Sequence, residues 1–417
     1  SIQTLGTFLS SNEDRPWYIL WIFAGGILTA TMVYGWFNSD SQRVSVIEKQ
    51  FPTETGYSGA WADQLTMDGE TYYFNHRQAK AALGKEALYT SAWDLPVEEQ
   101  EAQRASLKEK DTKALTIYQE APGGQLERVG EAQVRAVDLY QVEVTLSGET
   151  SVGTLAYEQV NDVSYNRLEK YDLPYRMPWP YLLPPLVLLL LTRTGIPVST
   201  SFLILTFFNP KNLQDMVLKS LMGYALAFIV AIVVYAIITN IVEKRFIERA
   251  ITRREKTVWS VLQWGSTGFL WSMWLIQDFA NIFVYLPRSI PGIQLVIALT
   301  ILLALLAYIF ANRGGEIQKI VKAKTNTVDI RSATIIDFTY ALLLLYFKEL
   351  NNVPMSTTWV FIGLLAGREI AIRFRLKDFP LDRKTWRMLG SDLIKVAFGL
   401  LVSIALVFVM RWLIDGF

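Results

Sequence analysis

The sequence predicts an all-α polytopic membrane protein with an inverted-repeat, transporter-like fold of discontinuous helices, plus a mixed α+β extracytoplasmic domain. Hydrophobic residues make up 51% of the 417 residues, a share typical of membrane proteins. Several apolar segments approach the roughly 20 residues that a helix needs to cross a bilayer. Two short helix-breaking segments, far apart in the chain, also have nearly the same sequence. Together these three observations predict the fold class.

The predicted spanning helices are apolar segments spread along the chain. They cover residues 17–37, 217–241, 258–276, 292–310, 333–346 and 393–410. Shorter apolar stretches flank the two helix-breaking segments and are predicted half-helices: residues 181–191, 202–208 and 360–366. Irregular backbone at membrane depth is tolerated only where protein buries it or where it lines a cavity. The breaks are therefore the first candidates for a binding site.

Residues 40–175 form a polar, acidic region that is long enough for an independent domain. Within it, residues 79–120 are rich in Ala, Glu, Lys and Gln and predict helices, whereas residues 135–163 alternate and predict strands. The predicted domains are residues 1–39 (N-terminal segment and first transmembrane helix), 40–175 (extracytoplasmic soluble domain), 176–257 (membrane domain, first repeat) and 258–417 (membrane domain, second repeat).

Basic loops predict the orientation. Residues 243–256 hold six Lys and Arg side chains, so this loop is expected on the cytoplasmic side. Counting helices from it places residues 313–331 and 368–387, which are also basic, on the same side. The N-terminus is then cytoplasmic and residues 40–175 are periplasmic, in a bacterial inner (plasma) membrane. Residues 1–15 lack the basic start of a cleavable signal.

Composition also bears on chemistry. The chain has no cysteine, so disulfides and thiolate metal sites are excluded, and its single histidine, His76, excludes a histidine-rich metal site. We find no nucleophile–base pair, phosphate-cradling glycine loop or metal cluster in the sequence, and therefore do not expect an enzyme.

The two helix-breaking segments share the pattern Pro, apolar residue, Ser, Thr, then Ser or Thr. The first reads Pro-Val-Ser-Thr-Ser from Pro197, and the second reads Pro-Met-Ser-Thr-Thr from Pro354. A proline followed by consecutive hydroxyl residues breaks a helix and leaves hydroxyls and backbone groups for a ligand. The predicted orientation makes the helices that enter the two breaks run in opposite directions. This is the layout of an inverted-repeat carrier.

With these segments the chain resembles the inorganic phosphate transporter family, whose repeats each carry Pro-Val-Ser-Thr-Thr-His and Asn-Asp-x-Ala-Asn. Residues 277–281 read Gln-Asp-Phe-Ala-Asn and are similar to the second element, with Gln277 in place of its first Asn. Gly363 and Gly367 follow the second break as in that family. The resemblance covers roughly residues 177–417 and depends on the order of these elements.

The resemblance implies a carrier of phosphate or a similar oxyanion such as sulfate, coupled to Na⁺ or H⁺. The implied anion-binding residues are Ser199, Thr200, Ser201, Ser356, Thr357, Thr358 and Asn281. Asp278 and Gln277, with help from Asn281, are implied to hold the coupling Na⁺. Hydroxyls and N–H groups at a helix start favour an anion, and carboxylate and amide oxygens suit a hard cation. An acid inside a membrane is costly and favours a functional role for Asp278; the alternative is a solvated capping residue at the outer mouth of its helix.

Two features differ from the family pattern. Phe202 and Trp359 stand where the family has histidine, and the first repeat shows no Asp-x-Ala-Asn element before residues 17–37. Only the Asn-Glu-Asp run at Asn12 could correspond to it. Arg193 could approach an anion at the first break, or it could reach the cytoplasmic interface instead.

Two functions remain open from the sequence. The first is secondary transport of phosphate or a similar oxyanion by rocking of two inverted halves. The alternative is a transport-inactive carrier fold that acts as an interaction or scaffold subunit of a membrane complex through its extracytoplasmic domain. A ligand sensor is a weaker reading, because no output domain is recognisable. The expected partners are the lipid bilayer, an inorganic anion, and a second copy or a membrane-complex subunit, with no nucleic acid.

Overall fold

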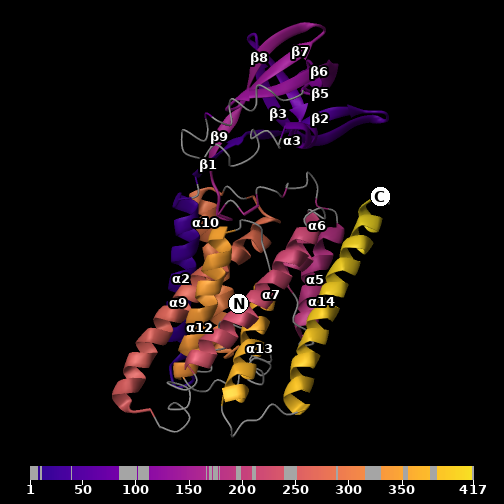
Figure 1. The fold of residues 1–417 in the computed structure, drawn as a ribbon. Helices are drawn as coiled ribbons and strands as arrows, with labels where there is room; N and C mark the ends of the chain where they lie inside the picture. Colours follow the sequence, from indigo (N-terminus) through magenta and orange to yellow (C-terminus); the bar gives the residue numbers. More distant parts are fainter. Residues whose placement is uncertain are drawn as a thin grey trace. The chain divides into compact units, whose positions relative to one another are not determined.

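A computed structural model gives the fold of the chain as two compact units (Figure 1). The helical unit comprises Ser1–Trp36, Val163–Leu173 and Met177–Phe417, and the β unit comprises Phe37–Asp162 with Pro174–Arg176. The structure describes residues 8–9, 12–38, 40–83, 101, 112–165, 167–168, 171, 177, 179–193, 199–208, 213–238, 251–287, 290–314, 330–350, 356–375 and 383–415. Residues 163–173, which the sequence assigned to the soluble domain, thus pack with the helices.

The β unit consists of a seven-stranded antiparallel sheet and a separate two-stranded antiparallel ribbon. In the ribbon, β1 (Asp40–Val44) pairs with β9 (Tyr157–Asn161). The seven-stranded sheet follows the chain order from β2 to β8. Its strands are β2 (Val46–Thr53), β3 (Gly56–Met67), β4 (Glu70–Asn75), β5 (Lys113–Glu120), β6 (Leu126–Asp138), β7 (Gln141–Leu146) and β8 (Glu149–Leu155). One helix, α3 (His76–Leu83), lies between β4 and β5 in the sequence.

The long strand β3 closes the sheet into a barrel, because it pairs with β8 as well as with β2 and β4. Leu65 of β3 lies opposite Leu155 of β8, and both side chains are buried. Gly153 permits this closure, since a Cβ atom there would lie 2.6 Å from Cδ1 of Leu65. Closure pairs an edge of β8 that would otherwise be open to association.

Part of the expectation for this unit is wrong. Residues 79–120 were predicted to be helical, but α3 ends at Leu83 and Lys113–Glu120 is strand β5. Leu115 and Ile117 alternate into the core, and this period of two outweighs the helix-favouring composition around it. Most of the stretch between α3 and β5 lies outside the described residues. The strands predicted within residues 135–163 are confirmed.

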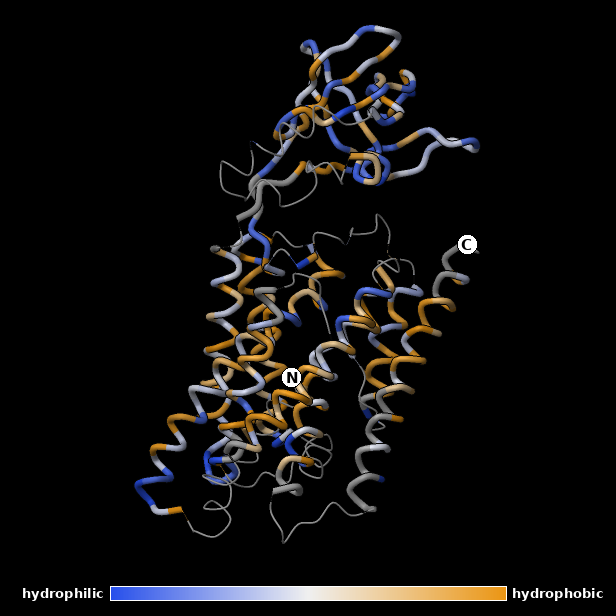
Figure 2. The backbone as a smooth tube through the Cα atoms, viewed as in Figure 1, coloured by the Kyte–Doolittle hydropathy of each residue, from blue (hydrophilic) through white to orange (hydrophobic). Residues whose placement is uncertain are grey.

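The helical unit is built from long, largely apolar helices. Orange predominates along them in Figure 2, whereas blue recurs through the β unit. After the 3₁₀ turn η3 (Trp179–Leu182), two short helices precede the long α7. The α-helices are α2 (Trp17–Asn38), α5 (Leu183–Arg193), α6 (Thr200–Phe208), α7 (Leu213–Ile238), α9 (Arg253–Phe283), α10 (Gly292–Ala311), α12 (Ile330–Leu350), α13 (Thr357–Arg375) and α14 (Arg383–Asp415).

The first helix, α2, lies between α9 and α10 and fixes their directions. Trp271 of α9 donates from Nε1 to the Ala24 carbonyl at 3.2 Å, and Asn12 donates to Oε1 of Gln263 at 2.8 Å, so α2 and α9 are parallel. Trp36 donates to the Ile290 carbonyl at 2.9 Å, just before α10 begins. Because the start of α10 meets the end of α2, these two helices are antiparallel.

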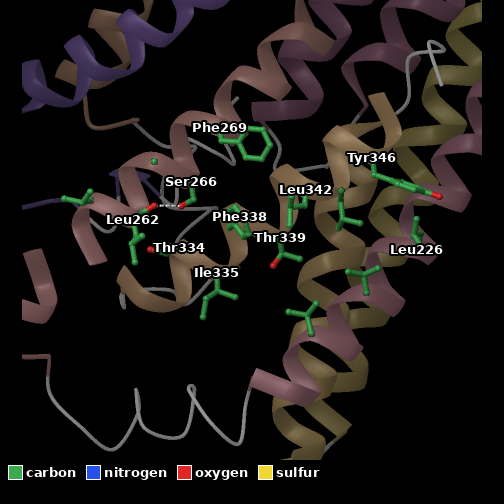
Figure 3. A pocket seen from close by; sticks show the side chains of 15 residues that line it. Leu226, Leu262, Ser266, Phe269, Thr334, Ile335, Phe338, Thr339, Leu342 and Tyr346 are labelled. Carbon is green, nitrogen blue, oxygen red and sulfur yellow. Dashed lines mark hydrogen bonds between the residues drawn. The ribbon is translucent and has the colours of Figure 1, made fainter. Parts of the chain in front are cut away.

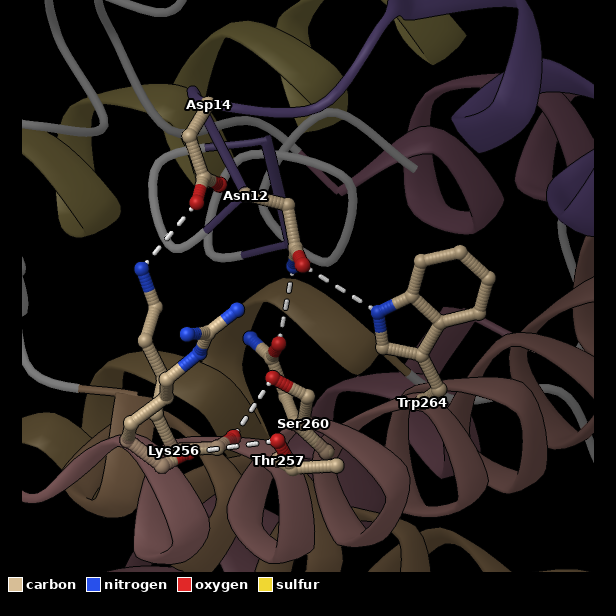
Figure 4. A network of polar contacts seen from close by, with 8 residues as sticks. Asn12, Asp14, Lys256, Thr257, Ser260 and Trp264 are labelled. Atoms are coloured by element: carbon tan, nitrogen blue, oxygen red, sulfur yellow. Dashed lines mark hydrogen bonds and ion pairs between the residues drawn. The ribbon is translucent and has the colours of Figure 1, made fainter.

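The N-terminal segment is attached to the start of α9 by polar contacts (Figure 4). Lys256 pairs with Asp14 at 3.0 Å, and this hydrogen bond lowers the pKa of the Asp14 carboxyl. Trp264 donates to Oδ1 of Asn12 at 3.1 Å. Just before α2 begins, the Arg15 carbonyl accepts a hydrogen bond of 2.9 Å from Arg313. Three basic residues from separate parts of the chain, Arg15, Lys256 and Arg313, therefore lie at one end of the helical unit.

Glycines set the crossing of α7 and α13, which pack closely along each other. A Cβ atom at Gly363 would lie 2.5 Å from the Tyr224 carbonyl oxygen, and one at Gly367 would lie 2.3 Å from the Phe228 carbonyl oxygen. Small residues at such positions let two helix backbones approach, as is common between membrane helices. The glycines that the sequence compared with a transporter motif thus serve helix packing.

The predicted fold class, an all-α polytopic membrane protein, is wrong. The β unit is a second, sheet-built part of the chain. Within the described ranges, three helices are long and apolar enough to cross a membrane: Trp17–Phe37, Leu213–Ala236 and Gly292–Ala311. Among the described residues, two other predicted spans correspond to shorter apolar stretches, Thr334–Tyr346 within α12 and Ala397–Val409 within α14, and another is part of the more polar, 31-residue α9. The predicted inverted repeat of discontinuous helices is wrong as well, because the three spans found among the described residues do not form two equivalent halves.

Candidate functional site

Each helix-breaking segment supplies the serine that caps the next helix. Oγ of Ser199 accepts a hydrogen bond from the Phe202 N–H at 3.1 Å, at the start of α6. Oγ of Ser356 accepts one from the Trp359 N–H at 3.2 Å, at the start of α13. Serine is favoured at this position because its hydroxyl satisfies an N–H group that the helix leaves open. The prolines themselves, at positions 197 and 354, lie outside the described residues.

The helix after the first break is short, as predicted for residues 202–208, since α6 ends at Phe208. The helix after the second break is not a half-helix, because α13 continues to Arg375. Ser201 is buried, and Thr200, Thr357 and Thr358 are half-buried.

The second break is held by its neighbours on α7 and α12. Its Ser356 N–H donates to Oγ of Ser220 on α7 at 3.0 Å. The Tyr340 hydroxyl of α12 donates to the Thr357 carbonyl at 2.8 Å. The backbone at the start of α13 is therefore fixed by two buried polar groups from different helices.

An aromatic contact joins the two breaks. The rings of Phe202 and Trp359 lie with centroids 5.9 Å apart and planes tilted by 32°, and both side chains are buried. These are the two residues that stand where the transporter family has histidine. The N-terminal ends of α6 and α13 therefore do approach each other, but the side chains that meet there are apolar rings.

The predicted cation-binding residues lie on the last turns of α9. Asn281 donates from Nδ2 to Oδ1 of Asp278 at 2.8 Å. Gln277 and Asn281 are 3% and 5% exposed, and Asp278 is half-buried. Oδ1 of Asn281 is buried and has no hydrogen-bond partner among the described residues. A buried acceptor left in this state costs about 1–3 kcal/mol, and a cation or a donor group would relieve that cost.

A buried arginine that sequence reasoning missed contacts this cluster. Arg167 is 6% exposed and donates from Nη1 to Oε1 of Gln277 at 2.7 Å. Gln277 therefore turns its oxygen toward a guanidinium group. No local pattern signals this role, because Arg167 follows an acidic domain and looks like a surface charge.

A further contact connects α9 with α12. Oγ1 of Thr267 donates to Oδ2 of the buried Asp337 at 2.6 Å.

Other sequence candidates lie apart from this cluster. Arg193 is exposed at the end of α5, as expected for an arginine that reaches a membrane interface. His76 pairs through Nδ1 with the buried Asp63 at 2.6 Å within the β unit. In the part of the chain that the structure describes, no group of three or more His, Cys, Asp or Glu side chains is arranged to hold a metal ion.

A cavity of about 1030 Å³ lies between α7, α9 and α12 (Figure 3). Side chains such as Leu226, Phe269 and Phe338 line it, and its wall is almost entirely apolar. The hydroxyls of Ser266 and Thr334 donate to carbonyls of their own helices, so they are not directed to a ligand. None of the predicted site residues is among those that line this cavity.

No family model, curated protein or solved structure matches this chain. The resemblance to phosphate transporters therefore depends on the motif residues alone.

Proposed function

We propose that this protein is a secondary transporter of inorganic phosphate or a similar oxyanion, coupled to Na⁺ or H⁺. The observation that carries the proposal is the polar group at the end of α9, in which Arg167 contacts Gln277 and Asn281 contacts the half-buried Asp278. Ionisable groups among membrane helices are costly, and they mark ion pathways more often than they stabilise a fold.

Asp278 and Asn281 suit the coupling cation. The carboxylate of Asp278 and the unpartnered Oδ1 of Asn281 belong to side chains that already touch each other. A carboxylate with an amide oxygen is a favourable donor set for a hard monovalent cation. Backbone carbonyls or water would complete such a site, so a group of three acidic side chains is not required.

The anion would bind at the starts of α6 and α13. Helix N-termini favour anions because their first N–H groups lack partners within the helix. In this proposal Ser199 and Ser356 cap the two helices, and the hydroxyls of Thr200, Ser201 and Thr357 would contact the anion.

The proposed location is a bacterial inner membrane, with the N-terminus cytoplasmic and residues 40–175 periplasmic. The gathering of Arg15, Lys256 and Arg313 at one end of the helical unit supports this orientation. Basic residues concentrate on the cytoplasmic side of membrane helices.

Radiolabelled phosphate uptake into proteoliposomes tests the proposal. An inward Na⁺ or H⁺ gradient should drive uptake above that of empty vesicles, and Asp278→Asn should abolish the dependence on the gradient. Asp337→Asn is a control, because Asp337 is a buried acid of the same helical unit outside the cluster. Absence of uptake for both phosphate and sulfate under both gradients would refute transport.

A second function, a scaffold subunit without transport, is favoured by one specific contact. The rings of Phe202 and Trp359 fill space between the two helix starts that an anion would need. In this alternative the β unit docks a partner of a membrane complex. Gentle purification of the native protein distinguishes the two, since a stoichiometric foreign subunit supports the scaffold and a lone homodimer contradicts it.

A further inference from the structure

We infer that the apolar cavity between α7, α9 and α12 binds an acyl chain of an anionic phospholipid, whose headgroup lies at Arg254. The inference does not depend on transport and rests only on the proposed membrane location of the helical unit. Three features support it: the apolar wall of the cavity, its length and open side, and the charge on the same face of α9.

The wall of the cavity favours an apolar ligand. Its volume of about 1030 Å³ reaches the upper end of the range of ordinary ligand pockets, about 300–1,000 Å³. Among the described residues, those that line it carry no charge, and the hydroxyls of Ser266 and Thr334 already donate to carbonyls of their own helices. Water needs several polar partners to enter a cavity, and an empty apolar space forfeits packing contacts on every side. A hydrocarbon chain meets the requirements of this wall.

The cavity is long and open on one side. Its lining on α12 runs from Thr334 to Tyr346, which is about 18 Å of helix at about 1.5 Å per residue. Figure 3 accordingly shows Tyr346 well apart from Thr334. The hydrocarbon chains of one leaflet extend over about 15 Å, half of a bilayer core. Val261 and Phe338 on the wall are 69% and 49% exposed, so a lipid chain can enter from outside the helical unit.

A basic side chain lies on the face of α9 that lines the cavity. Val261 and Gly265 belong to the lining and follow Arg254 by about two and about three helical turns, so the three residues share one face. Arg254 is exposed on the first turn of α9, about 10 Å along the axis from Val261. The neighbouring acid, Glu255, is bound to the Thr252 cap. An anion at Arg254 would therefore have the cavity entrance next to it.

Charge complementarity favours a phospholipid over other occupants. A neutral apolar molecule would use the wall without Arg254, and a free anion would use Arg254 without the wall. An anionic phospholipid uses both, with its headgroup at the membrane surface and a chain in the cavity. In the proposed orientation the start of α9 lies at the cytoplasmic leaflet, whose anionic lipids attract basic residues.

Thermal unfolding of the full chain, purified in detergent and stripped of lipid, tests the inference. Dioleoyl phosphatidylglycerol should raise the Tm in a saturable way, and phosphatidylcholine with the same chains should need about a fivefold higher concentration. Arg254→Gln should raise the half-effect concentration of phosphatidylglycerol about fivefold. Arg253→Gln is the matched control, because Arg253 is an exposed arginine of the same turn that points away from the cavity face. Glycerol 3-phosphate has the charge but no chain, and Arg254→Gln should remove no effect of this compound.

A second variant fills the cavity directly. Nothing lies within 4 Å of a Cβ atom at Gly265, which lines the cavity, so Gly265→Leu should occupy the space of the chain and abolish the saturable effect. Gly26→Leu on α2 is the matched control, since a Cβ atom there also meets open space and Gly26 is not part of the lining. Lipid extraction after gentle purification should recover more anionic phospholipid from the wild type than from Gly265→Leu.

Three results would overturn the inference. Equal shifts in the wild type and Gly265→Leu, or equal half-effect concentrations for the two lipids, would mean that lipid acts only as a general solvent of the helices. A polypeptide that co-purifies with the wild type but not with Gly265→Leu would identify a protein helix as the occupant. If Gly265→Leu fails to fold, the comparison of the two lipids on the wild type and on Arg254→Gln decides. Loss of transport in the uptake assay would leave these outcomes unchanged.

Discussion

The crossing of α7 and α13 predicts that a single methyl group added at Gly367 forces two helices apart. A Cβ atom there would lie 2.3 Å from the Phe228 carbonyl oxygen and 2.8 Å from Cβ of Ala231. Contacts below 3.0 Å essentially never occur, so the two backbones must separate by several tenths of an ångström. Overpacking of this kind costs about 1–3 kcal/mol, and we expect Gly367→Ala to lower the free energy of unfolding by that amount.

Thermal unfolding of the detergent-purified protein, followed by tryptophan fluorescence, measures this effect as a Tm lowered by a few degrees. Gly265→Ala on α9 is the matched control, because nothing lies within 4 Å of a Cβ atom there. Alanine favours a helix over glycine by up to about 1 kcal/mol, so the control should raise Tm. If Gly367→Ala melts at or above the wild-type temperature while the control behaves as expected, the close helix approach is refuted.

Two further predictions concern a helix cap and a surface carboxylate. Ser356→Ala removes the hydroxyl that caps α13 at Trp359 and should cost about 1 kcal/mol in the same assay, whereas Ser356→Asn should retain most of the stability; equal melting of the three proteins would exclude the cap. Hydrogen bonds from Lys49, and then from Tyr73, lower the pKa of Glu120 below its ordinary value of 4.5. Because its pKa is lower in the folded protein, ionised Glu120 stabilises the fold above about pH 4.5. This stabilisation is lost as the pH falls through the pKa of Glu120 in the folded protein. The resulting decrease in Tm at acidic pH is small because Glu120 is exposed. In Tm measurements down to about pH 3, Glu120→Gln should lack this decrease. A variant that loses as much Tm at acidic pH as the wild type would contradict the prediction.

The sequence located features that depend on local pattern. Two of the predicted spans, residues 17–37 and 292–310, agree closely with helices that the structure contains. The Ser-Thr runs mark helix starts because serine caps a helix through a hydroxyl near its own backbone. Both kinds of signal act over a few residues, so a chain read in one dimension is enough to find them.

Composition misled where tertiary contacts outweigh propensity. Lys113–Glu120 has helix-favouring neighbours, yet it pairs between β4 and β6 because its alternate side chains fill the barrel core. Within the described residues, fewer helices than predicted are long and apolar enough to cross a membrane, and polar groups such as Gln263 and Asp337 are buried within the helical unit. Apolar length alone does not distinguish a helix that faces lipid from one that protein covers.

The sequence by itself determined the apolar helices, the paired breaks and the acidic residue on α9, because periodicity, proline and hydroxyl residues are local properties. Only the tertiary structure decided that Phe202 meets Trp359, and that Arg167 reaches Gln277 across a separation of 110 residues. It also decided that β3 closes on β8. Such contacts join distant parts of the chain, and their energy depends on packing and burial that no short segment encodes.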